Sequence, residues 1–98
     1  DRVVKIKGYR VDLTEIEKFL RDIKGILNVI CLLKEYNKDK FIICLIQSEM
    51  KISLEVVISY LKKNIPFYMI PKKFYFLKKF PLNKNGKIDR RKILKLYL

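Results

Sequence analysis

The sequence predicts a small α+β domain, and three features of its 98 residues support that prediction. Half of the residues are hydrophobic, which is enough for one modest core at this length. Branched apolar runs at 26–33 and 41–46 predict strands, whereas two other segments space their apolar residues as helices do. The expected architecture is an N-terminal hairpin, a short central and mostly antiparallel sheet, and about three helices.

The N-terminal segment predicts a hairpin followed by a helix. Residues 3–13 surround Gly8, whose tolerance of positive φ suits a tight turn. Thr14 and Glu17 have the spacing of a capping box, in which Thr14 caps the helix and Glu17 reaches back to its first residue. Apolar residues then follow at helical spacing, and Gly25 ends the helix.

The rest of the chain predicts two further helices and one more strand. The polar segment 34–40 joins the two branched runs into an antiparallel hairpin. Ser53 is suited to cap a second helix, which Pro66 stops. A short strand at 74–77 and a loop lead to a last helix near Asp89. That last helix is expected to bury three side chains: Ile93, Leu94 and Tyr97.

The basic charge is concentrated in the second half of the chain. The first half, up to Glu49, carries 10 basic and 8 acidic side chains, whereas the remainder from Met50 carries 13 and 2. A basic segment suggests a phosphate-bearing or acidic partner, so a nucleic-acid-binding module is one alternative. A lysine-rich composition that merely solvates the surface explains the same charge.

The cysteines and the apolar runs bear on metal binding and localisation. Cys31 and Cys44 lie in apolar runs and predict two buried thiols in a reducing compartment. The sequence has no histidine, so no metal site is expected. Its longest apolar run is too short to cross a membrane, and its N-terminus lacks the layout of a secretory signal. A cytoplasmic protein without membrane contact is therefore expected.

The segment Asn85-Gly86-Lys87 carries the clearest chemical signal. Asn-Gly favours a tight turn, which would place Lys87 on an exposed loop. A lysine there can meet a phosphate or a carboxylate as a compact cation, as transfer of a charged group requires. The spacing alone also fits an ordinary structural turn.

Three segments in order resemble one known family. Residues 85–90 resemble the last signature of the adenylate-forming (AMP-binding) superfamily. That superfamily includes nonribosomal-peptide adenylation domains, D-alanine–carrier-protein ligases, acyl-CoA synthetases and luciferases. Residues 4–17 resemble the glycine-containing hairpin that opens its C-terminal subdomain, and residues 65–71 resemble its proline-flanked loop. The resemblance covers essentially the whole chain and favours the amino-acid-activating members.

The resemblance implies a C-terminal lid subdomain with a defined layout. Its hinge would lie near residue 1, its hairpin at 3–13, its core at 14–80 and its catalytic-lysine loop at 81–91. Lys87 would bridge the substrate carboxylate and a nucleotide phosphate oxygen. Asp1 would be the hinge residue between the two half-reactions.

The resemblance also implies roles around the hairpin and the loops. Gly8 would leave room for a pantetheine arm in the second half-reaction, and Lys5 would assist that step. The remaining residues would shape the two loops: Tyr68, Met69, Pro71, Asn85 and Gly86. Val3 stands where many relatives carry glutamine, and Lys7 where many carry arginine.

The resemblance further implies substrates and partners. ATP with Mg²⁺ would be bound mainly by an N-terminal adenylation domain that these residues lack, so the 98 residues alone are expected to be inactive. An amino acid would be activated and passed to the phosphopantetheine of an acyl or peptidyl carrier protein. Peptide synthetase and D-alanine ligase remain open, as does a non-catalytic interaction fragment.

Overall fold

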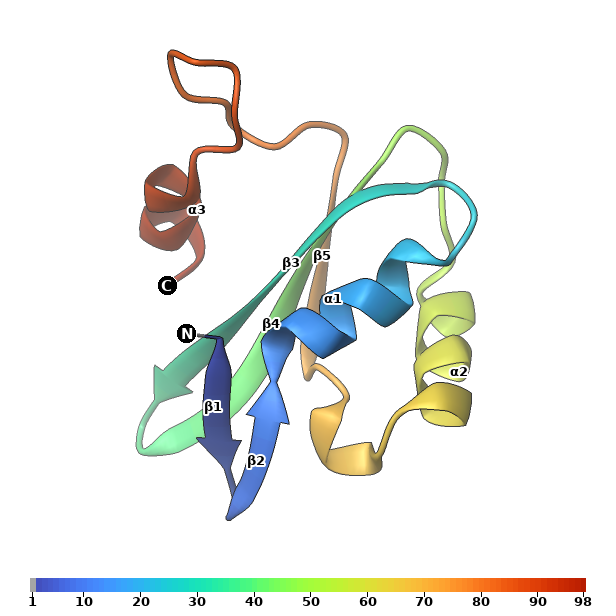
Figure 1. Ribbon diagram of the computed structural model, residues 1–98, viewed down its shortest axis with the longest axis vertical. Helices are drawn as coiled ribbons and strands as arrows, with labels where there is room; N and C mark the ends of the chain where they lie inside the picture. The colour runs from blue at the N-terminus through green and yellow to red at the C-terminus, as the bar shows by residue number, and fades with distance from the viewer. Residues whose placement is uncertain (1) are drawn as a thin grey trace.

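A mixed sheet forms the centre of the structure, a computed structural model that describes residues 2–98. β3 (Ile26–Tyr36) pairs antiparallel with β4 (Asp39–Ser48), which pairs in parallel with β5 (Lys73–Leu77). A separate antiparallel hairpin, β1 (Val3–Ile6) and β2 (Tyr9–Asp12), precedes this sheet (Figure 1). The predicted α+β class is confirmed.

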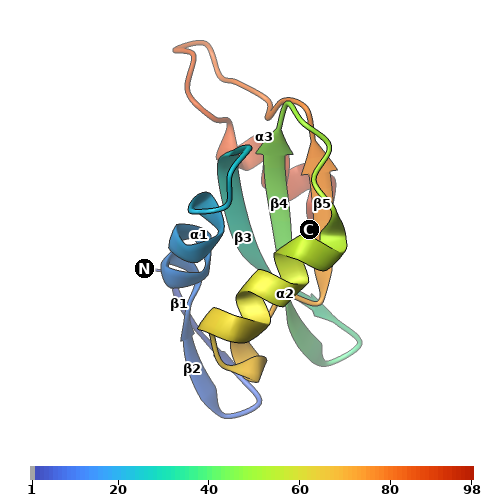
Figure 2. The same ribbon diagram turned by 90° about the vertical axis from the view of Figure 1, so that its right-hand side faces the viewer.

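Helices cover both faces of the central sheet. α1 (Leu13–Arg21) and α2 (Leu54–Asn64) lie on one face, and α3 (Arg90–Tyr97) lies on the other (Figures 1 and 2). A short 3₁₀ helix, η1 (Phe67–Met69), connects α2 to β5. No helix among residues 2–98 is long and apolar enough to span a membrane.

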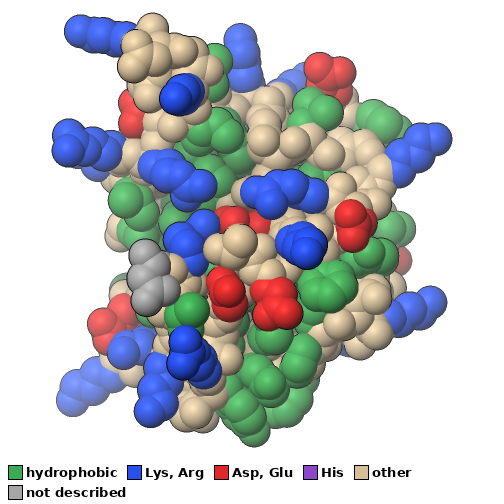
Figure 3. Space-filling model, in the orientation of Figure 1, with side chains coloured by type: hydrophobic (Ala, Val, Ile, Leu, Met, Phe, Trp, Pro, Cys, Tyr) green, Lys and Arg blue, Asp and Glu red, His purple; other side chains and the backbone are tan. Residues whose placement is uncertain are grey.

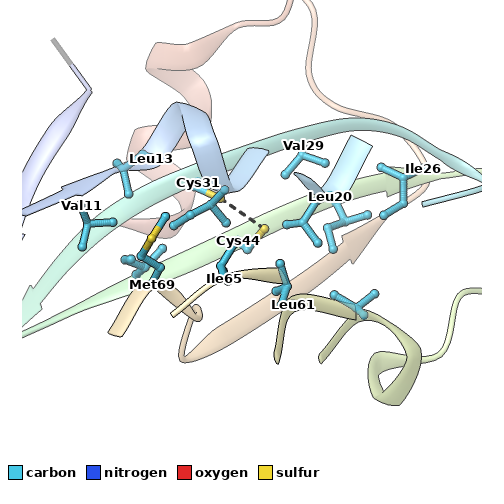
Figure 4. Close-up of a cluster of buried hydrophobic side chains, with 14 of the residues drawn as sticks. Val11, Leu13, Leu20, Ile26, Val29, Cys31, Cys44, Leu61, Ile65 and Met69 are labelled. Carbon is cyan, nitrogen blue, oxygen red and sulfur yellow. Dashed lines mark hydrogen bonds between the residues drawn. The ribbon is translucent and has the colours of Figure 1, made fainter. Parts of the chain in front are cut away.

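The strands of the central sheet alternate their side chains between two cores, as the period of a strand requires. Cys31, Cys44 and Ile46 face α1 and α2 in the larger core, which Figure 4 shows in close-up. Ile43 and Leu45 face the opposite side, where Phe80 and Ile93 complete a smaller core beneath α3. Both faces of β4 are therefore buried, which explains its continuous apolar sequence.

The buried thiols are as predicted. Cys31 and Cys44 are directly opposite residues of β3 and β4, both fully buried, with their sulfur atoms 3.5 Å apart. Burial in the apolar core, together with the hydrogen bond between the two thiols, raises the pKa of the Cys44 thiol well above its ordinary value.

Two predicted boundaries were wrong for local reasons. The loop expected at 34–40 is only a two-residue turn, because Asn37 and Lys38 both adopt positive φ (49° and 65°) and the strands continue up to them. α1 is capped by Asp12, whose carboxylate accepts a hydrogen bond from the Thr14 amide at 3.0 Å. The predicted cap by Thr14 and Glu17 is therefore absent, and Glu17 is buried instead.

The prediction for the last helix was partly wrong. Ile93 is buried as expected, and the ring of Tyr97 packs 4.9 Å from that of Tyr75 in β5. Leu94, however, is 41% exposed. α3 has only two turns resting on the sheet, and the position after Ile93 points away from it.

Candidate functional site

The loop that carries Lys87 is closed by hydrogen bonds within itself. The Asn83 amide donates to the Lys87 carbonyl at 2.7 Å, and the Gly86 amide donates to the Asn83 carbonyl at 3.0 Å. Gly86 has φ +80°, a conformation that side chains disfavour, so glycine is required there. A bridge between Leu82 and Ile88 closes the loop at its base.

Asn83 organises this loop, and the sequence analysis did not single it out. Its side-chain oxygen accepts from the Asn85 amide at 2.9 Å and from the Lys87 amide at 3.1 Å. Such a turn, in which an asparagine bonds the backbone two residues on, is a known signal that could have identified it. Asn85 and Gly86 contribute to the loop through their backbone.

The loop is exposed, but both of its ends are fixed. Lys87 is exposed to solvent, as are the other residues from Leu82 to Gly86. Before the loop, Phe80 is buried in the smaller core. After it, the Asp89 amide donates to the Pro81 carbonyl at 2.8 Å. The Asp89 carboxylate caps α3 by accepting a hydrogen bond from the backbone amide of Lys92. Lys87 is thus an exposed cation on a loop whose ends are held by hydrogen bonds and packing.

The hairpin turn is formed by Lys7 and Gly8. Both residues have positive φ (49° and 84°), and the strands pair directly on either side of them. A Cβ at Gly8 would meet no atom within 4 Å. Glycine at this position therefore permits the positive φ of the turn, and the space beside it is open.

Lys5 lies on the exposed side of the hairpin. It pairs directly across the two strands with Arg10, which is also exposed. Like charges placed opposite each other disfavour strand pairing. The two residues therefore concentrate positive charge on one side of the hairpin.

The proline-flanked loop packs against the hairpin. The ring of Tyr68 stacks on that of Tyr9, with centroids 4.0 Å apart and planes 6° from parallel. Met69 and Pro71 are buried beneath the loop. Tyr68, Met69 and Pro71 thus hold the loop in place, and Tyr9 is a partner that sequence reasoning missed.

The same aromatic side chains border an apolar groove of about 410 Å³. Its walls come from the hairpin, from η1 and from the start of β4, and they include Ile6, Phe41 and Phe67. Phe67 is 75% exposed. No residue of the Lys87 loop contributes to this groove, so the groove belongs to the hairpin end of the molecule.

The structure does not bring Lys87 and Gly8 together. The molecule measures 38 × 27 × 22 Å, and the Lys87 loop and the hairpin turn lie at opposite ends of its longest axis (Figures 1 and 2). The central sheet separates them. Asp1, the predicted hinge, lies outside the described residues.

Two other expectations concern metal binding and nucleic-acid binding. Among residues 2–98, no cluster of three acidic or cysteine side chains is arranged to hold a metal ion. Basic side chains project from many parts of the face in Figure 3, with acidic ones between them, instead of forming one continuous stripe there. That face therefore gives no footprint for a nucleic-acid backbone.

Comparisons with known proteins agree with the family expected from the three signatures. The chain is 37% identical over 92 residues to surfactin synthase subunit 3 of Bacillus subtilis, covering 93% of this chain and 7% of that protein. It is 40% identical over 92 residues to bacitracin synthase 1 of Bacillus licheniformis, covering 93% of this chain and 2% of that one. No family model matches the chain.

Solved structures match the fold over nearly the whole chain. Holo-AB3403, a four-domain nonribosomal peptide synthetase bound to AMP and glycine, gives a TM-score of 0.80 at 32% identity, over 90% of this chain and 7% of that one. Klebsiella oxytoca NpsA, in complex with 3-hydroxyanthranilyl-AMSN, gives a TM-score of 0.86 at 26% identity, over 97% of this chain and 19% of that one.

These matches place the chain within much longer proteins. It spans between 1% and 10% of the length of the curated relatives that it matches. The matching portion is the C-terminal subdomain of their adenylation domains. The chain belongs to the adenylate-forming superfamily, as a C-terminal subdomain most like those of nonribosomal-peptide adenylation domains.

Proposed function

We propose that these residues form the moving lid of an ATP-dependent ligase that activates an amino acid and passes it to a carrier thiol. One observation carries this proposal: Lys87 and the Gly8 turn lie at opposite ends of the same domain (Figure 1). By rotating, a domain built in this way can present one end to the active site in the first half-reaction and the other end in the second. Family membership supports the chemistry. The hinge for the rotation is proposed at Asp1, where the resemblance implies it.

Lys87 acts in the first half-reaction. A carboxylate oxygen of the amino acid attacks the α-phosphorus of ATP, the bond to the bridging oxygen breaks, and pyrophosphate leaves. Negative charge builds on the attacking carboxylate and on the phosphate oxygens, and the Lys87 ammonium stabilises it from its exposed loop. Mg²⁺, held by residues outside this segment, supplies further charge neutralisation.

The hairpin acts in the second half-reaction. The pantetheine thiol loses its proton and attacks the carbonyl carbon of the aminoacyl-adenylate, forming a thioester and releasing AMP. The open space above Gly8 gives the pantetheine arm room to pass. Lys5, with Arg10 opposite it, supplies positive charge beside that path and assists the departure of negatively charged AMP.

The partners follow from this scheme. The lid works against its own N-terminal adenylation domain, which holds ATP and the amino acid. The thiol belongs to an acyl or peptidyl carrier protein, and the excess positive charge of the second half of the chain favours an acidic partner. ATP as substrate and a pair of buried thiols are consistent with a cytoplasmic enzyme.

Amino-acid-dependent ATP–pyrophosphate exchange by the full-length protein tests this proposal. D-alanine and the common L-amino acids form the substrate panel. We expect exchange with one of them, and a loss of about 10²-fold or more in Lys87→Ala, as is typical when a transition-state charge partner is removed. Lys84→Ala is the matched control because Lys84 is an exposed lysine of the same loop.

Two results would contradict the proposal. If none of the amino acids in the panel supports ATP–pyrophosphate exchange, amino-acid activation is excluded, and the search moves to other carboxylic acids. Equal losses in Lys87→Ala and Lys84→Ala would mean that the loop contributes only general positive charge.

A further inference from the structure

The first described residue of the chain is fixed more firmly than any loop residue of the candidate site. The Arg2 guanidinium forms two parallel hydrogen bonds with the Glu17 carboxylate, Nη1 to Oε1 at 3.2 Å and Nη2 to Oε2 at 2.8 Å. Nη2 also donates to the Cys31 carbonyl at 2.6 Å. The Arg2 carbonyl accepts from the Leu13 amide at 3.0 Å. One residue therefore bonds both ends of segment 13–17 of α1 and also bonds β3, directly before β1 begins.

The acceptor of these bonds is buried among apolar side chains. The Glu17 side chain is only 2% exposed, and its Oε2 also accepts from the Cys31 amide at 2.7 Å. A buried carboxylate that loses its cation is left as an uncompensated charge away from water. Separating Arg2 from Glu17 is therefore strongly unfavourable. The hydrogen bond to Glu17 raises the pKa of Arg2, which stays charged.

A second arginine provides an internal comparison. Arg21 also approaches Glu17, one turn further along α1, but its nearest nitrogen is 4.0 Å from Oε1 and its side chain is about half exposed. Arg21 is on the same helix as Glu17 and ties no other element to it. The two arginines bring the same charge to one carboxylate, and only Arg2 links the start of the chain to the domain.

We propose that Arg2 anchors the start of this chain to the body of the domain, so that the lid moves as one rigid body from residue 2 onward. The inference rests on the proposed function in one respect, namely that the lid rotates about residue 1. If the anchor holds, no part of that rotation is taken up from residue 2 onward. Arg2 is then a positioning residue for both Lys87 and the hairpin.

The rigidity of the connection decides how accurately the lid can be placed. A lid whose first strand detached would turn about a longer and softer segment, and the loop at its far end would sample many positions. Misplacing a catalytic group by about 1 Å can cost 10²-fold in rate. Arg2 removes that freedom because it bonds two elements, α1 and β3, at the point where β1 begins.

Hydrogen exchange in the full-length protein tests the anchor directly. The two reporters are the Leu13 amide, which bonds the Arg2 carbonyl, and the Cys31 amide, which bonds Glu17. In Arg2→Met, which keeps much of the apolar stem, we expect the Leu13 amide to exchange about 10-fold faster or more through local opening. Arg21→Met removes the same charge and is expected to leave that amide unchanged.

The half-reactions test the positioning role in the same variants. With Arg2→Met we expect kcat for both adenylation and thiol transfer to fall about 10-fold per folded molecule, with KM for ATP and amino acid unchanged. In the proposed scheme the N-terminal domain holds ATP and the amino acid, and Lys87 acts on charge that builds in the transition state. Misplacement of the lid is therefore expected to lower kcat and to leave KM nearly unchanged. Arg2→Lys keeps the charge without the two-pronged geometry and should recover part of the rate.

Each outcome bears on a separate claim. Unchanged exchange at Leu13 in Arg2→Met would overturn the anchor, whatever reaction the protein catalyses. Faster exchange with a normal kcat would reduce Arg2 to a stabilising contact and overturn its positioning role. Absence of any adenylation in the wild type would contradict the proposed function. The anchor would then be tested by hydrogen exchange of the Leu13 amide alone.

Discussion

The Arg2 anchor and the Lys87 loop are built in opposite ways. The anchor joins residues that are 15 and 29 positions apart, and its acceptor is buried. The turn that presents Lys87 is exposed, and the hydrogen bonds of Asn83 that shape it join residues at most four positions apart. The comparison shows two kinds of construction: long-range contacts hold Arg2 against the body of the domain, and a local turn presents Lys87 to solvent.

The largest expected effect is on stability at the anchor. Glu17→Ala removes the carboxylate that holds Arg2 and the Cys31 amide, which leaves both without this acceptor. We expect the free energy of unfolding to fall by about 2–4 kcal/mol, below the usual cost for a fully buried pair because Arg2 is partly solvated. Denaturant titration measures the change.

Glu15→Ala is the control for that experiment. Glu15 lies in the first turn of the same helix and is exposed. Its removal should change the free energy of unfolding by only about 0.5 kcal/mol. Similar losses in both variants would mean that helix charge, and not the buried pair, accounts for the effect.

Loosening the loop should affect catalysis more than stability. Asn83→Ala removes the side-chain acceptor of the Asn85 and Lys87 amides. We expect adenylation to slow about 10-fold through misplacement of Lys87, with an unfolding free energy lower by about 1 kcal/mol. Asn85→Ala is the matched variant, since Asn85 contributes a backbone amide that alanine retains. A larger loss in Asn85→Ala would refute the assignment to Asn83.

The turn of the hairpin offers a smaller effect of the same kind. Gly8→Ala places a side chain at φ +84° in open space. We expect a cost of about 1 kcal/mol in unfolding free energy from backbone strain. If the pantetheine arm passes here, thiol transfer should also slow, while adenylation stays near the wild-type rate. An equal effect on both half-reactions would show that strain alone is responsible.

The last expected effect concerns pH and arises only in alkaline solution. Burial raises the pKa of Cys44, so the folded protein keeps that proton when the unfolded chain releases it. The contribution to stability is complete below the unfolded pKa of about 8.5 and is lost as the pH rises above it. The loss approaches about 1.4 kcal/mol per pH unit. Between pH 8 and 10 the urea midpoint of the wild type should therefore fall relative to that of Cys44→Val, and parallel curves would contradict this.

The sequence predicted local features better than long-range ones, for a physical reason. The Asn85-Gly86-Lys87 turn and the Gly8 turn depend on the backbone preferences of the residues that form them. Asn83 was missed, although its spacing to the two amides is also local. Glu17 was assigned to a cap by spacing to Thr14, because nothing in a single sequence indicates that Arg2 is its partner in space.

The central sheet illustrates the same limit. The runs of branched residues predicted β3 and β4 and their antiparallel pairing. The parallel pairing of β5 with β4 depends on the crossover through α2 and η1, which brings 73–77 back alongside 43–47. The burial of Ile93 and the exposure of Leu94 were likewise decided by the way α3 rests on the sheet.

The central claim, that the two ends of the lid serve different half-reactions, is tested most directly by single-turnover transfer from preformed aminoacyl-adenylate. The variant is Lys87→Ala in the full-length protein, mixed with the carrier protein. Since the rotated lid carries Lys87 away from the reacting atoms, the account predicts transfer near the wild-type rate beside an adenylation rate reduced about 10²-fold. Equal losses in both steps would contradict it.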